Sequence, residues 1–453
     1  MISDQSLVYE DKTTGLPRSS GWGIVWIEAI EGYSKTKLCY PLSSVLSLAA
    51  DRLPSLLVFG PQTEFPSDQV LQGLHQELIS SPQLSALEEA VDELPQFWHG
   101  LIGFDPGLRQ VPGGKYLVDL KRWVKDGGPF PNHQSNAPNH YGLTVTALLQ
   151  IIQYSRYLDQ LGKDAHRKVL NSVKVGGIQG FCVGFVSAVA VASPKSEAEI
   201  DPSAATALCV AVCVGAYVDL DGIYSSAATV YVAVAIRWRE GDAEKVAKLI
   251  WPIPNAYISS INDEASVTVT IRADDHEGLI DKARENNLRT KDVHVYGRFH
   301  THNHSHAADK LTKLLAFLKG LQFPDAEELQ VPVCNTADGN IISGGPLTRF
   351  ALENTLVNVV DCGILASIAQ NSGVWILALR NLEESKPKGE KVLDGSYING
   401  YVNGHITGIN WVNDIHSSYD LFPGADSVDG LWDLVMERKT MVEPAPVERL
   451  GLP

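Results

Sequence analysis

The sequence predicts an α/β protein whose main body carries a smaller inserted unit, and three segments support this. Residues 173–192 form a short apolar run, a glycine-flanked turn and a second apolar run, which together predict a strand, a sharp turn and a buried helix. Residues 56–60 predict an apolar strand that ends at a glycine. Across residues 228–296, strand and helix patterns alternate in the order β-α-β-β-α-β.

The turn at residues 180–184 has the sequence GFCVG and is the strongest candidate for chemistry. Gly180 and Gly184 lie two residues either side of Cys182, where they let the backbone turn sharply and let neighbouring chain approach. This is the Gly-x-Ser-x-Gly nucleophile elbow with cysteine in place of serine. The alternative is a structural cysteine, because free cysteine is among the most buried residue types. These five residues alone support both interpretations about equally.

Apolar periodicity predicts further elements in the main body. Helices are expected at residues 68–79, 84–94, 143–161, 204–218, 306–321 and 346–356. A strand is expected at residues 331–333, and loops are expected at residues 124–142 and 193–202.

The inserted unit is predicted element by element from the same patterns. Its strands are expected at residues 228–238, 255–261, 266–272 and 293–296, and its helices at residues 242–250 and 274–286. The predicted domains are an unplaced N-terminal extension, a two-part core, the inserted unit, and a C-terminal wrap or linker. In that order they occupy residues 1–52, 53–225 with 298–385, 226–297, and 386–453.

Composition and charge exclude several classes of protein. The 453 residues are 44% hydrophobic and 20% charged, which is a globular composition with enough apolar side chains for a core. The net charge of −16 argues against binding to nucleic acid or to an anionic membrane surface. No uncharged apolar run reaches bilayer length, and the N-terminus lacks a signal pattern. Six cysteines are too sparse for a disulfide framework, so we expect a cytoplasmic protein with reduced thiols.

This arrangement resembles the acyltransferase family of fatty-acid and polyketide synthases. In that family an α/β-hydrolase-like domain carries the elbow, a ferredoxin-like subdomain is inserted after it, and the catalytic histidine follows the insert. Here residues 297–300 (GRFH) follow the β-α-β-β-α-β unit directly. The elbow cysteine narrows the resemblance to the starter-unit:acyl-carrier-protein transacylase domains of fungal nonreducing polyketide synthases. Residues 56–63 (LLVFGPQT) and 215–219 (GAYVD) are also similar to that subfamily.

The resemblance covers residues 55–380 and departs from the family near its end. The chain has Asp361 and Cys362 where the family often has Asp-Trp, and no Phe-Gly-Pro follows residues 374–377. These departures leave the placement of the last 80 or so residues open but do not touch the expected active site.

The resemblance implies a ping-pong acyl transfer through a thioester on Cys182, with His300 as the general base. A helix N-terminus and an adjacent imidazole would both favour the thiolate of Cys182. Backbone N–H groups of Val183 and Gln62 would bind the oxyanion, and a backbone carbonyl in the segment at Asn335 would orient the histidine. No permanently bound cofactor is expected. The substrate would be an acyl-CoA or a phosphopantetheine-linked acyl group.

The implied partner is an acyl carrier protein, with an upstream fatty-acid synthase or reducing polyketide synthase as a further candidate. Carrier proteins are usually acidic, so docking onto this acidic chain would need a local basic patch. The candidates are Arg298, Lys310, Lys313 and Lys319. An ordinary solvated helix face explains these residues equally well.

The alternating histidines 300, 302, 304 and 306 raise the question of a metal site. A zinc site needs three or four convergent ligands. This run passes from a strand into a helix, so its side chains would diverge. We therefore expect no metal, and we expect His302, His304 and His306 at solvent-facing or rim positions.

The expected acyl group is neutral. Malonyl-specific members of the family use an arginine to hold the substrate carboxylate, but residues 204–218 contain none, and the first arginine after Cys182 is Arg237. If Arg237 reached the pocket, the chain could instead be a malonyl or other extender-unit acyltransferase. A thioester hydrolase of α/β-hydrolase type and a non-catalytic scaffold that binds a carrier are the remaining alternatives.

Overall fold

The structure is a computed structural model that describes most of the chain between residues 53 and 362. The described residues are 23–26, 53–61, 68–131, 137–224, 230–239, 242–263, 265–318, 320–362, 375–379, 401–402 and 405–406. Gln62 and Lys319 lie outside the described residues, as do nearly all of the predicted N-terminal extension and C-terminal segment.

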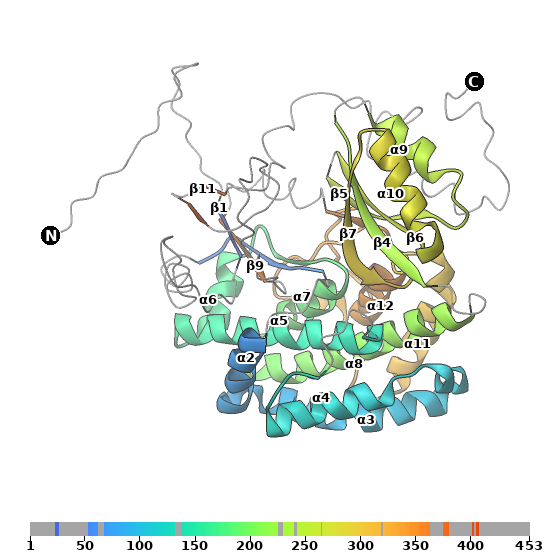
Figure 1. Ribbon diagram of the computed structural model, residues 1–453. Helices are drawn as coiled ribbons and strands as arrows, with labels where there is room; N and C mark the ends of the chain where they lie inside the picture. The colour runs from blue at the N-terminus through green and yellow to red at the C-terminus, as the bar shows by residue number, and fades with distance from the viewer. Residues whose placement is uncertain are drawn as a thin grey trace, which may run out of the picture.

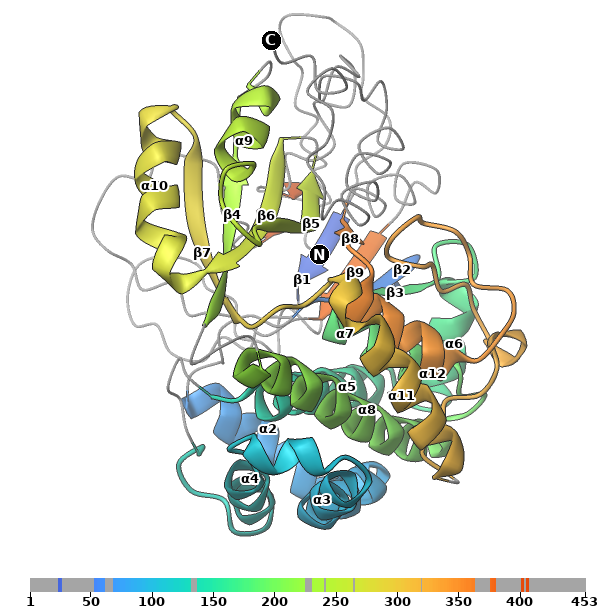
Figure 2. The same ribbon diagram turned by 90° about the vertical axis from the view of Figure 1, so that its right-hand side faces the viewer.

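The main body is mostly helical, and its two longest helices, α5 and α8, lie side by side (Figures 1 and 2). Helices α3 and α4 form an outer layer beneath this pair (Figure 2). The helices of the body are α2 (Asp68–Ser80), α3 (Ser85–Phe104), α4 (Gly114–Asp126), α5 (Asn139–Leu161), α6 (Ala165–Ser172), α7 (Val183–Ala192), α8 (Glu197–Tyr224), α11 (Ser305–Phe317) and α12 (Leu347–Leu352).

A parallel sheet lies above these helices and provides the strands that precede the elbow. Its order is β1-β9-β2-β3. Its strands are β1 (Gly23–Trp26), β2 (Leu56–Phe59), β3 (Ile178–Gly180) and β9 (Trp375–Leu379), and a separate antiparallel pair joins β10 (Tyr401–Val402) to β11 (His405–Ile406). All four residues of β2 are buried, which explains its continuous apolar sequence.

The second sheet has the element order that the sequence predicts, with helices α9 and α10 on one face (Figures 1 and 2). Along the chain the elements are β4 (Tyr231–Arg237), α9 (Ala243–Ile250), β5 (Tyr257–Asp263), β6 (Ser266–Arg272), α10 (His276–Glu285) and β7 (Arg289–Tyr296). The order in the sheet is β7-β4-β6-β5-β8, and neighbours among the first four strands are antiparallel. These elements enclose an apolar core of their own.

Strand β8 (Val360–Asp361) was not predicted, and it pairs parallel with β5. The chain thus returns from the body to the edge of the second sheet. Residues 331–333 do not form the predicted strand; the nearest pairing is an isolated bridge between Cys334 and Ile341.

Two helices are longer than predicted because packing outweighs the cost of proline. Helix α3 continues through Pro95, since its buried side chains recur at helical spacing on both sides of that residue. Helix α8 likewise begins at Glu197 and contains Pro202, so the predicted polar loop before it is short. Helix α8 is long and apolar enough to cross a membrane, but 83% of its apolar window is buried inside the protein, as in a core helix.

Candidate active site

Cys182 occupies the turn between β3 and α7 in a backbone conformation that few non-glycine residues adopt. It has φ 53° and ψ −126°, a positive φ at which an L-residue is strained. The strand places Gly180 beside Phe59 of β2, and α7 begins directly after the cysteine. The residue is 8% exposed. The fold therefore holds this thiol at the start of a buried helix against a steric cost.

Both glycines of the turn lie where a side chain has no room. A Cβ on Gly180 would lie within 3.0 Å of the backbone oxygen of Gly184. A Cβ on Gly184 would lie equally close to the oxygens of Phe59 and Gly60 at the end of β2. The first turn of α7 therefore packs directly against the backbone of two strands.

His300 is buried, and a backbone carbonyl fixes its imidazole. Its φ is 56°, and its Nδ1 lies 2.8 Å from the carbonyl oxygen of Asn358. Because a carbonyl only accepts, Nδ1 carries the proton and Nε2 keeps its lone pair. Burial lowers the pKa of His300 to about 4, although the Asn358 carbonyl opposes this shift. The imidazole is therefore neutral at pH 7 and can accept a proton at Nε2.

The carbonyl that orients His300 does not come from the segment at Asn335, as the resemblance implied. Asn335 closes a local turn, in which its side chain accepts from the N–H of Ala337 and its carbonyl accepts from the N–H of Gly339. The correct carbonyl belongs to Asn358, directly after the π-helical turn η6 (Glu353–Val357).

The segment 355–358 contacts both Cys182 and the loop of His300. The hydroxyl of Thr355 lies 3.4 Å from the carbonyl oxygen of Cys182, while its shorter hydrogen bond, at 2.7 Å, goes to the carbonyl of Ala351. The carbonyl of Leu356 accepts from the N–H of Thr301 at 2.9 Å, and that of Asn358 accepts from His300. The structure thus brings the elbow and the histidine to one short segment, although 118 residues separate them in the sequence.

Burial keeps the thiol of Cys182 protonated in this structure. It raises the pKa of Cys182 to about 12, while a hydrogen bond from the backbone N–H of Val183 acts in the opposite direction. The first N–H of the helix thus favours the thiolate, as expected, but desolvation is the larger effect and keeps the thiol protonated. In this structure the thiol of Cys182 and the imidazole of His300 are therefore both neutral.

The backbone N–H of Val183 lies close enough to the thiol of Cys182 to lower its pKa. It is the first N–H of α7, which the helix leaves without an internal acceptor. A donor in this place is available to an oxygen that forms next to the sulfur. Gln62, the other expected oxyanion donor, lies outside the described residues.

Comparison with known proteins points to one family. Residues 132–300 match the family described as "Starter unit:ACP transacylase in aflatoxin biosynthesis". The chain is 31% identical over 419 residues to the non-reducing polyketide synthase esdpA of Penicillium shearii, an alignment that covers 88% of this chain. This part of the chain is thus similar to the starter unit:ACP transacylase family, and the relatives that resemble the chain over most of its length are fungal polyketide synthases.

Other relatives are similar over most of this chain. The chain is 30% identical over 410 residues to 5-methylorsellinic acid synthase of Aspergillus terreus and 31% identical over 423 residues to the non-reducing polyketide synthase pkbA of Emericella nidulans. These alignments each cover 87% of the chain. The chain spans only 16% to 19% of the length of the three relatives.

Solved structures with partial similarity include two bacterial proteins. An acyl-carrier-protein S-malonyltransferase from Burkholderia pseudomallei has a TM-score of 0.47 and 16% identity, covering 72% of this chain and 89% of its own. FabD from Acinetobacter baumannii has a TM-score of 0.45 and 15% identity, covering 72% and 87%.

Two of the four basic residues suggested for carrier docking are held in ion pairs. Arg298 makes two hydrogen bonds to Asp221 of α8, from Nε at 2.6 Å and from Nη2 at 2.5 Å, and its guanidinium stacks over Tyr231. Lys310 pairs with Asp105 at 2.6 Å. Lys313 is exposed on α11. Lys319 lies outside the described residues.

The histidines after His300 do not share one environment. His304 is buried, and its Nε2 donates to the carbonyl of Arg298 at 2.6 Å, so the expectation of a solvent-facing position is wrong for this residue. His302 is half-buried and His306 is exposed. Within the part of the chain that the structure describes, no group of three His, Cys, Asp or Glu side chains could hold a metal ion.

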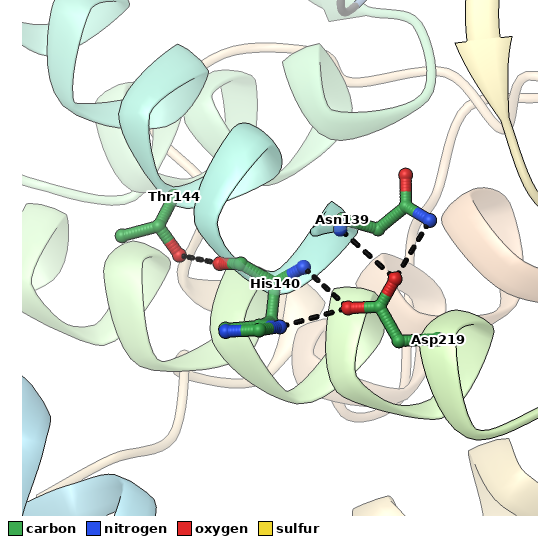
Figure 3. Close-up of polar contacts among 4 residues, drawn as sticks. All are labelled: Asn139, His140, Thr144 and Asp219. Atoms are coloured by element: carbon green, nitrogen blue, oxygen red, sulfur yellow. Dashed lines mark hydrogen bonds and ion pairs between the residues drawn. The ribbon is translucent and has the colours of Figure 1, made fainter. Parts of the chain in front are cut away.

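Sequence reasoning missed a polar cluster that joins α5 to α8 (Figure 3). Asp219 accepts hydrogen bonds from the backbone N–H groups and the side chains of Asn139 and His140, at 2.8 to 3.1 Å. It therefore caps the N-terminus of α5 from a neighbouring helix. A Cβ on Gly297 would meet Asn139, so the cluster adjoins the start of residues 297–300. Residues 215–219 stand out in the sequence for their similarity to the family. The sequence could not show that Asp219 binds two residues about 80 positions earlier in the chain.

Proposed function

We propose that the chain transfers a starter acyl group from an acyl thioester to the phosphopantetheine thiol of an acyl carrier protein and so initiates polyketide synthesis. The donor would be an acyl-CoA or an upstream carrier protein. The observation that supports this best is a strained cysteine at a helix N-terminus that shares a bridging segment, 355–358, with an oriented neutral histidine. Strain of this kind is concentrated at active sites.

The proposed first half-reaction loads the enzyme. Nε2 of His300 takes the proton of the Cys182 thiol as the sulfur attacks the acyl carbonyl carbon. The backbone N–H of Val183 stabilises the oxyanion. When the bond to the donor sulfur breaks, the imidazolium protonates the leaving thiolate. The product is an acyl thioester on Cys182.

The second half-reaction reverses these roles. His300 deprotonates the incoming phosphopantetheine thiol, which attacks the Cys182 thioester, and the proton returns to the sulfur of Cys182. One thioester is broken and one is formed in each half-reaction. Because the bond types match, the transfer is close to thermoneutral and the acyl group can both enter and leave. No bound cofactor takes part.

The partner of His300 favours acyl transfer over hydrolysis by a Ser-His-Asp type of enzyme. Such hydrolases orient their histidine with a carboxylate. Here a backbone carbonyl occupies that position. A neutral carbonyl stabilises an imidazolium less than a carboxylate does, which suits the deprotonation of a thiol better than that of water.

The position of Arg237 favours a neutral acyl group over malonate. Its guanidinium pairs with Asp263 at the end of β5, which lies two strands away from β4 in the second sheet. It is therefore held at that sheet and not available as the carboxylate partner that an extender-unit transferase needs. Burial of a substrate carboxylate without a partner costs several kcal/mol.

We also infer the finer architecture that goes with this function. The body with the parallel sheet would be an α/β-hydrolase-like core, and the β4–β7 unit a ferredoxin-like subdomain inserted at about residues 226–297. The element order and antiparallel pairing of β4 to β7 support this assignment. A cytoplasmic location and an association with an upstream synthase belong to the same proposal.

Intact-mass analysis after incubation with acetyl-, hexanoyl- and malonyl-CoA tests the proposal. We expect one acyl adduct, located on the peptide that contains residues 180–184, with hexanoyl or acetyl loading faster than malonyl. Cys182→Ala should abolish the adduct and transfer to a carrier, whereas Cys182→Ser should load slowly and release even more slowly.

Cys209→Ala is the matched control. Cys209 is 7% exposed and burial raises its pKa to about 12, as for Cys182, but it lies within the regular helix α8. This variant should keep the adduct. Transfer by Cys182→Ala at a comparable rate would disprove the acyl-enzyme route, and faster malonyl loading would favour the extender-unit alternative.

A further inference from the structure

Gln150 is a buried amide on α5 that contacts the strand beside the elbow. The residue has no solvent exposure, and its Nε2 donates to the carbonyl oxygen of Gly60 at 2.7 Å. Among the described residues its Oε1 has no hydrogen-bond partner. Burial of an amide that is only half satisfied costs free energy, and a leucine would fill this helix position at less cost. The hydrogen bond to Gly60 is therefore the feature that needs an explanation.

The two carbonyls at the end of β2 face the elbow. The oxygen of Phe59 accepts from the N–H of Phe181 at 3.0 Å. The oxygens of Phe59 and Gly60 both lie so close to Gly184 that a Cβ there would come within 3.0 Å of them. The Gly60 carbonyl thus lies against the first turn of α7, the helix that begins at Val183.

The orientation of this carbonyl matters for the charge that forms in the reaction. Under the proposed function, negative charge develops on the substrate oxygen beside the Val183 N–H. A carbonyl oxygen turned toward that place would compete for the donor and repel the oxyanion in a site of low dielectric. Glycine at position 60 offers the backbone freedom to rotate in this way.

We infer that Gln150 is a positioning residue for acyl transfer, whose amide holds the Gly60 carbonyl away from the oxyanion beside Val183. The inference rests on the proposed function of Cys182. Gln150 touches neither substrate nor the reacting atoms. It acts through the backbone of Gly60, so its loss should affect the step that builds an oxyanion and spare reactions of the thiol that build none.

Two reagents separate these effects in the Gln150→Leu variant of the full chain. Iodoacetamide alkylates the Cys182 sulfur by direct displacement without an oxyanion, whereas an acyl-CoA acylates it through a tetrahedral oxyanion. We expect alkylation within about threefold of wild type and acylation slowed by about 10- to 100-fold. Gln153→Leu is the matched control, because Gln153 is also buried and lies one turn further along α5. It should acylate at the wild-type rate.

A second variant, Gln150→Glu, gives a pH readout that a merely structural role would not produce. The protonated carboxyl can donate to the Gly60 oxygen as the amide does, but the carboxylate cannot. Acylation of Gln150→Glu should therefore be close to wild type at low pH and fall below it as pH rises. This comparison is made within one protein and does not depend on whether Gln150→Leu folds.

Several outcomes would overturn the inference. Equal acylation rates in Gln150→Leu and Gln153→Leu would show that Gln150 has no role in acylation beyond that of any buried glutamine on α5. Equal slowing of alkylation and acylation would show that the elbow itself is distorted. If the acylation rate of Gln150→Glu changed with pH as the wild-type rate does, the hydrogen bond that residue 150 donates to Gly60 would not control acylation. If wild-type Cys182 takes up no acyl group, the proposed function fails, and this role fails with it.

Discussion

Cys182 is the unusual member of the residues with positive φ. Among the described residues, the other non-glycine residues with positive φ are asparagine, aspartate or histidine, which adopt positive φ more readily than most residues. Cys182 also has a ψ of −126°, far from the left-handed helical region. The steric cost is opposed by the packing of β3 and α7 on either side, so the strain stays at the sulfur that the proposed chemistry uses.

His300 should determine how transfer depends on pH. His300→Ala should reduce transfer by about two to four orders of magnitude, the usual span for loss of a general base. Because burial lowers the pKa of His300 to about 4, wild-type acylation should stay near its pH 7 rate down to about pH 5. An ordinary histidine would lose activity already near pH 6.5. Rates of acyl-adduct formation measured across this range test the prediction.

The same pKa shift predicts a loss of stability in acid. The pKa of His300 is lower in the folded than in the unfolded state, so the unfolded state binds the proton more readily between pH 6.5 and about 4. The contribution of His300 to the free energy of unfolding is fully present above pH 6.5. It is lost, by about 3 kcal/mol, as the pH falls from 6.5 to about 4. Denaturant unfolding of wild type and His300→Ala should therefore converge at low pH. Parallel curves would contradict the low pKa.

At the scale of elements, the approach of α7 to β2 should make Gly184 irreplaceable. Gly184→Ala should destabilise the protein by roughly 3 kcal/mol or more, because backbone oxygens on β2 cannot move aside as a side chain would. Gly278→Ala in α10 is the control, since a Cβ there meets nothing within 4 Å. It should stabilise by about 0.5–1 kcal/mol. Thermal unfolding of both variants tests this, and similar shifts would refute the close approach.

The sequence predicts elements that depend on a local pattern. It does not predict contacts with backbone atoms that are far away in the sequence. The elbow and the β-α-β-β-α-β order are visible because glycine spacing and apolar periodicity are local properties. The carbonyl of Asn358 has no side-chain signature, so the resemblance placed it at Asn335. Strand β8 has only two residues and is a strand only because it pairs with β5. The contact between Gln150 and Gly60 spans 90 residues and is equally invisible in the sequence.

At the scale of the whole molecule, the protein is acidic, and two of the basic side chains suggested for docking form ion pairs within the protein. The net charge is −16. Arg298 and Lys310 neutralise Asp221 and Asp105 and contribute less positive charge to the surface than their sequence positions suggest. Arg298 also fixes the loop of His300 at two points, since its guanidinium binds α8 and its carbonyl accepts from His304. Its position is better suited to holding the histidine than to meeting a carrier.

Steady-state kinetics with an acyl carrier protein should separate these two roles. Arg298→Met removes both hydrogen bonds to Asp221 and the positive charge that balances this half-buried carboxylate, so the loop of His300 should shift. We expect kcat to fall by about tenfold or more while the KM for the carrier changes by less than about twofold. Lys313→Met is the control, because Lys313 is exposed on α11. It should leave kcat unchanged, and any effect should appear in KM. If Arg298→Met instead raised KM at constant kcat, Arg298 would be a docking residue, and the acidic surface would offer the carrier a basic contact there after all.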